Sequence, residues 1–287
     1  MSTSTSTATG NRTVTYKQGS AAGRWLRGHL VLILGLIVLV YTFVPIFVVV
    51  LMSFNAPTSR LIYRFDGFTL HNWLNPCEAE GMCSALGTSI EIGLLATLGS
   101  TVLGTLIAFA LVRHDFVGRS SMNLLIFLPM ASPEIVMGSS LLALFVAAGR
   151  GGQLGFWTIL IAHIMFCISF VVVTVRARLA GLDDNLEQAA MDLYATPQQT
   201  FWRVTFPLVF PGILGAALLS FSLSFDDFIV TNLNAGNTTT FPMFVWGVAQ
   251  RGVPMQVNVV GTVMFLISVL IVVGGEVNSR RRQRALT

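Results

Sequence analysis

Six long apolar runs constrain the fold of this chain more than any other feature. They cover roughly Leu30–Phe54, Leu86–Val112, Met122–Ala147, Phe156–Val175, Leu208–Val230 and Met255–Gly275. A helix needs about 20 predominantly apolar residues to cross the hydrocarbon core of a bilayer. Only 10% of the residues are charged, whereas a typical soluble domain has about 25%. The sequence therefore predicts an all-α membrane protein with about six transmembrane helices.

The basic residues predict the orientation of these helices. Thirteen of the 17 Lys and Arg residues lie at the chain ends or in loops on one predicted side of the membrane. The other four lie on the opposite side, at Arg60, Arg64, Arg150 and Arg251. Because cytoplasmic segments carry an excess of Lys and Arg, we expect both termini to be cytoplasmic. The net charge of +4 then reflects topology, and nothing in the sequence indicates a nucleic-acid partner.

We expect one membrane-embedded domain over residues 29–278. Residues 1–28 are rich in Ser and Thr and poor in apolar residues, which predicts a disordered cytoplasmic N-terminus. Residues 279–287 form a basic cytoplasmic tail suited to anionic lipid headgroups. A polar loop at about residues 179–207 separates two apolar runs on the predicted cytoplasmic side.

That polar loop contains two helix-capping patterns. They are Asp184-Asn185-Leu186-Glu187 and Thr196-Pro197-Gln198-Gln199, the second with Pro at the first helical position. We expect two short helices with a turn near Tyr194–Ala195. Apolar residues at helical spacing would give the first helix one apolar face, formed by Leu186, Ala189, Ala190 and Leu193. The pattern fits either a hairpin lying on the bilayer surface or a docking element for a cytoplasmic partner.

The same loop resembles the EAA loop of ABC-importer permeases. That pattern has Glu-Ala-Ala, three residues, Gly, nine residues and then Ile-x-Leu-Pro. The spacing is kept here, with the slots at Gln188-Ala189-Ala190, Tyr194, Val204, Phe206 and Pro207. Four identities differ, and Glu187 directly before the first slot can supply the acidic group. A turn with positive φ in the Gly slot would strain Tyr194.

Other segments are similar to the polyamine (spermidine/putrescine) branch of these permeases, in particular to the second of its two permease subunits. They are GTLIAFALVR at 104–113, LPMASPEIVMG at 128–138 and SFDDFIV at 224–230. The resemblance extends from about Leu30 to Gly275. It implies a type I ABC-importer permease fold with a cytoplasmic coupling (EAA) helical hairpin, in a bacterial inner membrane.

The resemblance also implies a set of partners. These are a second homologous permease, two copies of an ABC ATPase and an extracytoplasmic substrate-binding protein. The chain has no G-x-x-x-x-G-K-[ST] phosphate loop, so we expect no cofactor and no enzymatic site here, and ATP and Mg to bind the partner ATPase. The residues expected to couple to that ATPase are Glu187, Gln188, Ala189, Ala190, Asp192, Tyr194, Thr196, Pro197 and Pro207.

Four acidic residues lie within the predicted spans, at Glu91, Glu134, Asp226 and Asp227, and no Lys or Arg lies at comparable depth. Ionisable residues inside a membrane are costly and usually functional. Several spaced carboxylates would suit an elongated polycation, and Trp246 is a candidate cation–π partner. Structural alternatives stay open: Glu91 could be solvated at the interface, and Glu134 could bond to backbone freed by Pro129 and Pro133.

On a continuous helix, four polar residues would form one stripe, Ser220, Ser224, Asp227 and Thr231. The stripe favours Asp227 over Asp226 as the side chain that faces a substrate path, and the alternative for Asp226 is a face turned to a partner subunit. His163 in the fourth span is expected to make a helix–helix hydrogen bond rather than to relay protons. Two functional alternatives remain: a permease for another small solute, and a stand-alone carrier driven by protons or cations.

Three cysteines occur in the sequence. Cys77 and Cys83 lie close together in a predicted extracytoplasmic loop, where they form either a local disulfide or two free thiols. Their spacing does not favour zinc, and no metal site is predicted. Cys167 is expected to be a small buried residue of the fourth span.

Overall fold

The computed structural model describes residues 21–59, 64–183 and 185–284. Every named element in this part of the chain is helical, and one isolated β-bridge pairs Asn55 with Phe68. The elements are α1 (Ala21–Ser53), α2 (His71–Leu74), α3 (Met82–Arg113), α4 (Arg119–Ala131), α5 (Glu134–Ala147), η1 (Gly151–Gln153), α6 (Phe156–Ala180), α7 (Asn185–Asp192), α8 (Pro197–Thr200), the π-helical η2 (Phe201–Thr205), α9 (Phe206–Asp226), α10 (Ile229–Asn234), α11 (Phe241–Ala249) and α12 (Met255–Arg284).

The prediction of about six spans is confirmed. Among the described residues, five helical runs are long and apolar enough to cross a membrane, and the pair α4 and α5 makes a sixth if it is counted as one bent span. The chain ends differ from the expected boundaries. Helix α1 begins at Ala21, within the stretch expected to be disordered, and α12 continues to Arg284 in the expected tail. Residues 1–20 and 285–287 lie outside the described part.

The third predicted span is not one straight helix, which corrects the sequence prediction. Helices α4 and α5 meet at an angle of 110°. Ser132 and Pro133 between them have extended ψ angles of 138° and 134°. Because the ring of Pro133 disfavours helical geometry at the preceding residue, the helix ends there, and a new helix starts at Glu134.

The fifth predicted span is also broken. Helix α9 ends at Asp226, Asp227 has an extended ψ of 124°, and α10 starts at Ile229. The stripe from Ser220 to Thr231 is therefore not one face of a continuous helix. The break forms because the Asp227 carboxylate accepts hydrogen bonds from the N–H groups that begin α10, as the side chain of a helix-capping residue does.

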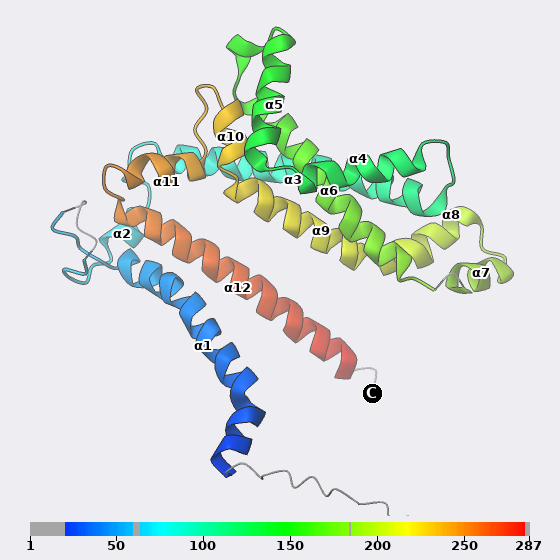
Figure 1. Ribbon diagram of the computed structural model, residues 1–287, viewed down its shortest axis with the longest axis horizontal. Coiled ribbons are helices and arrows are strands. Elements are labelled where there is room, and N and C mark those ends of the chain that lie inside the picture. The colour runs from blue at the N-terminus through cyan, green and yellow to red at the C-terminus, as the bar shows by residue number, and fades with distance from the viewer. Residues whose placement is uncertain (1–20, 60–63, 184, 285–287) are drawn as a thin grey trace, which may run out of the picture.

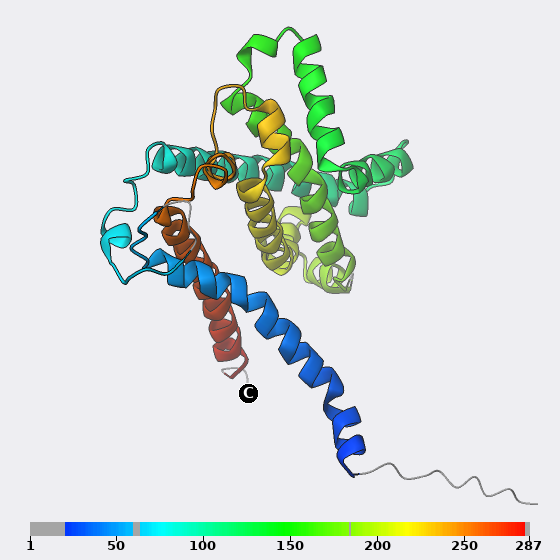
Figure 2. The ribbon, with the colours of Figure 1, turned by 60° about the vertical axis from the view of Figure 1, so that its left-hand side comes forward.

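Helices α3, α6 and α9 pack against one another and form the centre of the molecule, with α4 and α5 alongside (Figures 1 and 2). Small residues permit the close approach of these helices, as is common between membrane helices. A Cβ atom added at Gly104 of α3 would lie 2.7 Å from Val171 of α6. Branched and small apolar side chains fill the interface, including Ala108, Leu111, Val172, Val175, Val209 and Ala216.

Helices α1 and α12 pair with each other outside this centre (Figure 2). In the most apolar stretch of α1, no residue is buried within the protein. Two ends of the central bundle carry different elements: α10 and α11 lie at one end, and α7 and α8 lie at the other (Figure 1). This separation places the two candidate sites described below on opposite sides of the molecule.

The connection between α1 and α3 is held together by side-chain amides and by a disulfide. Asn55 accepts from the Asp66 N–H and donates to the Arg64 carbonyl, while Asn72 donates to the carbonyl oxygens of Ser53 and Asn55. Cys77 and Cys83 form a disulfide, so the disulfide alternative is confirmed. Cys167 is a buried free thiol.

A hydrogen-bonded carboxylate links the two described parts of this connection, residues 55–59 and 64–66. Hydrogen bonds from the Thr58 hydroxyl and backbone N–H, together with Arg64, hold the pKa of Asp66 well below its usual range. A depressed folded-state pKa means that this contribution to stability is fully present above the unfolded pKa of about 3.9 and declines as the pH falls below it. At neutral pH the Asp66 carboxylate is therefore ionised and keeps its bonds to Thr58 and Arg64.

The disulfide gives a direct prediction. In the unreduced, denatured chain only Cys167 should react with a maleimide, and after reduction all three cysteines should react. Mass spectrometry of the labelled protein counts the adducts. As a control, Cys83→Ser should leave Cys77 reactive without reduction. Three adducts on the unreduced wild-type chain would contradict the assignment.

Candidate functional site

The bent third span and the broken fifth span together enclose a cavity of about 730 Å³. Its wall is built from the N-terminus of α5, the middle of α6, the end of α9, the start of α10 and one face of α11. Both breaks in helical geometry lie at this cavity, so the local sequence at Pro133 and Asp227 determines its shape. The lining residues are Glu134, Phe166, Leu223, Phe225, Asp226, Asp227, Phe228, Ile229, Phe241, Pro242, Val245, Trp246 and Ala249.

The polar part of the lining is acidic. Asp226 at the end of α9 and Glu134 at the start of α5 are both exposed. Within the described part of the chain, the lining contains no Lys, Arg or His. Of the residues expected along a substrate path, the structure brings together Glu134, Asp226, Asp227 and Trp246. Glu91 is exposed on α3 and is not part of the lining.

The apolar part of the lining is mainly aromatic. Phe228 and Trp246 lie with their ring centroids 5.1 Å apart, and Phe225 and Phe241 lie 6.3 Å apart. Phe166 of α6 completes the set. From the sequence, Trp246 was the one aromatic residue predicted to contact a cation, although Phe225 and Phe228 directly flank the two aspartates. Aromatic faces beside carboxylates form a suitable surface for an ammonium group, which both attract.

Asp227 has a different environment from its neighbour. It is 8% exposed, and its carboxylate accepts from the Thr231 N–H at 2.7 Å and from the Thr231 hydroxyl at 2.8 Å. The structure also places His163 within 3.4 Å of this carboxylate. His163 bonds to Ser224 of α9 and Thr231 of α10, which confirms the expected helix–helix hydrogen bonding.

Close packing of α10 against α5 supports the cavity from behind. A Cβ atom added at Gly138 would lie 2.8 Å from Leu233 and 3.2 Å from the Val230 Cα atom. The Asn234 side chain donates to the Gly138 carbonyl across this contact. The start of α5, which carries Glu134, is thus held against the helix that follows Asp227.

The second candidate site is the hairpin formed by α7 and α8. Tyr194 has φ of 63°, the single positive φ of a non-glycine residue in the described part. Its N–H donates to the Met191 carbonyl, and the Ala195 N–H donates to the Ala190 carbonyl. These two bonds form a Schellman motif, the usual end of a helix that is followed by Gly. The turn of the Gly slot is therefore retained with Tyr in its place.

The second capping pattern of the hairpin is confirmed. The Thr196 hydroxyl accepts from the Gln199 N–H, and the Gln199 side chain accepts from the Thr196 N–H. The first pattern includes Asp184, which lies outside the described residues. Glu187, the last residue of that first pattern, connects α7 to other elements. Its Oε1 atom accepts from Arg113 of α3 at 2.5 Å and from Thr205 of η2 at 2.7 Å.

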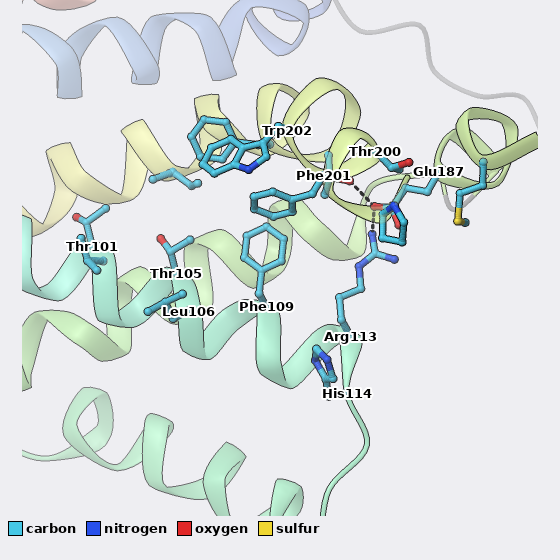
Figure 3. Close-up of a pocket in the computed structure, with 16 residues that line it drawn as sticks. Thr101, Thr105, Leu106, Phe109, Arg113, His114, Glu187, Thr200, Phe201 and Trp202 are labelled. Atoms are coloured by element: carbon cyan, nitrogen blue, oxygen red, sulfur yellow. Dashed lines mark hydrogen bonds and ion pairs between the residues drawn. The ribbon is translucent and has the colours of Figure 1, made fainter. Parts of the chain in front are cut away.

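Figure 3 shows these contacts at one end of an apolar groove of about 760 Å³ between α3, α9 and the hairpin. Phe109 of α3 faces Phe201 of η2, with ring centroids 5.5 Å apart. A π-helical turn, Phe201–Thr205, lies just before Pro207, which has no N–H to donate. Residues 197–226 nevertheless form one helical run, so the hairpin continues directly into the helix that ends at Asp226.

Large apolar residues of α7 and of the turn that follows it are exposed. Leu193 is 81% exposed and Tyr194 is 95% exposed, and Leu186 and Met191 are also exposed. An exposed group of large apolar side chains on a polar hairpin is typical of an interaction surface. Among the described residues, no group of three or more His, Cys, Asp or Glu has an arrangement that could hold a metal ion.

These features define a helical membrane-transport component with an acidic, aromatic cavity at one end and a helical hairpin at the other. The chain belongs to the family "Binding-protein-dependent transport system inner membrane component", which matches residues 100–279. It is 33% identical over 266 residues to the "Spermidine/putrescine transport system permease protein PotC" of Escherichia coli (strain K12), covering 92% of this chain and 98% of the relative. It is 35% identical over 230 residues to the "Putrescine transport system permease protein PotI" of the same strain, covering 78% and 81%.

A solved structure supports the fold assignment. A chain of a bacterial ABC transporter involved in the import of the acidic polysaccharide alginate superposes with a TM-score of 0.60 at 16% identity, covering 91% of this chain and 98% of that chain. The fold is thus that of an ABC-importer permease, as the sequence resemblance implied.

The hairpin turn yields a stability prediction. A non-glycine residue in the left-handed region costs about 1 kcal/mol, so Tyr194→Gly should stabilise the hairpin by up to about 1 kcal/mol. Tyr194→Val should destabilise it, because a β-branched residue is least tolerant of positive φ. Amide hydrogen exchange of residues 185–200 measures both effects. Faster exchange in Tyr194→Gly than in the wild type would contradict the prediction.

Proposed function

We propose that this chain is a permease subunit of an ATP-driven importer that moves polyamines inward. The observation that carries the proposal is the cavity that combines Asp226 and Glu134 with five aromatic side chains and, among the described residues, no basic one. The curated relatives PotC and PotI are named for spermidine and putrescine transport. Polyamines are aliphatic chains with ammonium groups at intervals, so they match carboxylates for the charges and aromatic faces for the methylene groups.

The two sites fit opposite sides of the membrane. We place the cavity and the disulfide-bonded connection on the extracytoplasmic side, and the α7–α8 hairpin and both termini in the cytoplasm. The distribution of basic residues supports this orientation. The disulfide supports it as well, because disulfides persist in oxidising compartments.

The hairpin is the proposed coupling element. Its exposed apolar residues would dock on an ATPase partner, two copies of which would bind ATP and Mg. Glu187 ties the hairpin to α3 and η2, and the helical run from Pro197 reaches Asp226. A movement of the hairpin would therefore be transmitted along α9 to the cavity. A second homologous permease and an external binding protein complete the proposed assembly.

The residues proposed to couple the chain to the ATPase lie on or directly beside three helices. Gln188, Ala189, Ala190 and Asp192 lie on α7, where they would contact the ATPase or support those that do. Thr196 and Pro197 start α8, and Pro207 lies at the start of α9. Glu91 would contribute to the path only from outside the cavity of this chain.

The path residues can be tested by removing charge without changing shape. Asp226→Asn and Glu134→Gln should each reduce kcat/KM for spermidine or putrescine uptake by about tenfold, because a charge-assisted contact to the cation is lost. The measurement is uptake by the assembled transporter in proteoliposomes with its binding protein. Glu80→Gln, an exposed carboxylate outside the cavity, is the matched control.

Unchanged uptake in both cavity variants would remove the cavity from the transport path. Uptake by the isolated chain without ATP or an ATPase would instead favour a stand-alone carrier. Transport of an uncharged or anionic solute in preference to polyamines would contradict the proposed substrate class.

The docking face can be tested by placing a charge on it. Leu193→Asp should abolish most of the ATPase stimulation produced by the loaded binding protein, because a buried unpaired carboxylate disrupts an apolar contact. Leu193→Met retains the apolar surface and should behave like the wild type. Co-purification of the ATPase subunit reports docking directly, and normal stimulation of Leu193→Asp would exclude this face as the contact.

A further inference from the structure

A buried histidine bridges the two sides of the break in the fifth span. His163 lies in the middle of α6 and is 2% exposed. Its Nδ1 atom lies 2.7 Å from the Ser224 hydroxyl, and its Nε2 atom lies 2.9 Å from the Thr231 hydroxyl. Ser224 belongs to α9 and Thr231 to α10. One imidazole thus holds the helix before the break and the helix after it.

The hydrogen-bond partners determine which ring nitrogen carries the proton. The Thr231 hydroxyl donates its single hydrogen to Asp227 Oδ2 at 2.8 Å. The Thr231 oxygen must therefore accept from His163, and Nε2 must be the donor. In the neutral imidazole, Nδ1 is then an acceptor for the Ser224 hydroxyl. Both ring nitrogens, both hydroxyls and one carboxylate are thereby satisfied without a further partner.

This network gives the two neighbouring aspartates opposite environments. Asp227 is buried, and its carboxylate is engaged by the Thr231 N–H and hydroxyl and by the Val230 N–H at 3.4 Å. Both residues border the cavity, but Asp226 is exposed whereas the Asp227 side chain is only 4% exposed. Extended backbone at Asp227 turns consecutive side chains away from each other. In a continuous helix the Val230 and Thr231 N–H groups would donate to backbone carbonyls instead, and the Asp227 carboxylate would lose these two donors.

We propose that His163 is a positioning residue for transport. By bridging Ser224 and Thr231 it fixes the break so that Asp227 points into the protein and Asp226 points into the cavity. Asp226 then contacts the cation, and Asp227 supports the break. The inference rests on the proposed function, and it reverses the preference for Asp227 that the polar stripe suggested.

Thiol accessibility tests this arrangement without using transport. Asp226→Cys and Asp227→Cys are made separately in a Cys167→Ala background, and each variant is assembled into the full transporter. The probe is a cationic, membrane-impermeant methanethiosulfonate reagent. The thiol introduced by Asp226→Cys should react at least about tenfold faster than the one introduced by Asp227→Cys, because a buried position reacts only when the structure opens locally. Equal rates in otherwise intact transporters would overturn the proposal.

Because Asp227→Cys itself removes a cap, a second pair of variants leaves both aspartates in place. Thr231→Val removes the hydroxyl that links His163 to Asp227 and conserves volume, whereas Thr231→Ser retains the hydroxyl. Thr231→Val should lower kcat/KM for spermidine uptake about tenfold, as expected for buried groups left without a partner. Thr231→Ser should retain a kcat/KM for spermidine uptake near the wild-type value.

The accessibility of Asp226→Cys in the Thr231→Val background separates positioning from general destabilisation. A positioning role predicts a changed modification rate at position 226 in Thr231→Val and an unchanged rate in Thr231→Ser. Identical uptake and identical modification rates in the two Thr231 variants would overturn the proposal. If the wild-type transporter moves no polyamine while the accessibility pattern holds, the proposed function fails and the arrangement of the two aspartates stands.

Discussion

The structure depends on the rule that backbone polar groups in a membrane must be satisfied within the protein. Helices satisfy this rule by themselves, and a break in a helix does not. In the fifth span, the Asp227 carboxylate accepts from the backbone N–H groups of Val230 and Thr231. The Thr231 hydroxyl donates to the same carboxylate, and His163 of the neighbouring helix bonds to that hydroxyl. This polar network stabilises the break in the helix. The break in turn forms part of the cavity at which Asp226 is exposed.

A single helical run connects the two candidate sites. It starts at Pro197 in the hairpin, passes through the π-helical turn before Pro207 and ends at Asp226 in the cavity wall. Glu187 fixes the start of this run to α3 through Arg113. In the proposed function, a movement of the hairpin would reach Asp226 through this continuous helical run, which would couple ATP hydrolysis by the partner to movement of a cation.

Most of the helical layout could be predicted from the sequence, because span length and apolar content are local properties of each segment. The residue spacing in the polar loop likewise predicted two short helices joined by a turn near Tyr194. The breaks at Pro133 and Asp227 have local causes but were not predicted, because both segments were treated as continuous apolar spans. The contact of His163 with Thr231 could not be predicted, because these residues are far apart in the sequence yet adjacent in the structure. For the same reason the stripe analysis favoured Asp227, and the aromatic lining at Phe166 and Phe228 was missed. Tyr194 adopts the left-handed turn because the helix end and the following capping box fix it from both sides.

The most direct test of the central claim is a structure of the assembled transporter trapped with spermidine. Ligand density is expected in the cavity between Asp226 and Glu134, beside Phe228 and Trp246, with Asp227 still bonded to Thr231. Ligand density away from this cavity, or bound to Asp227 with Asp226 turned aside, would contradict it.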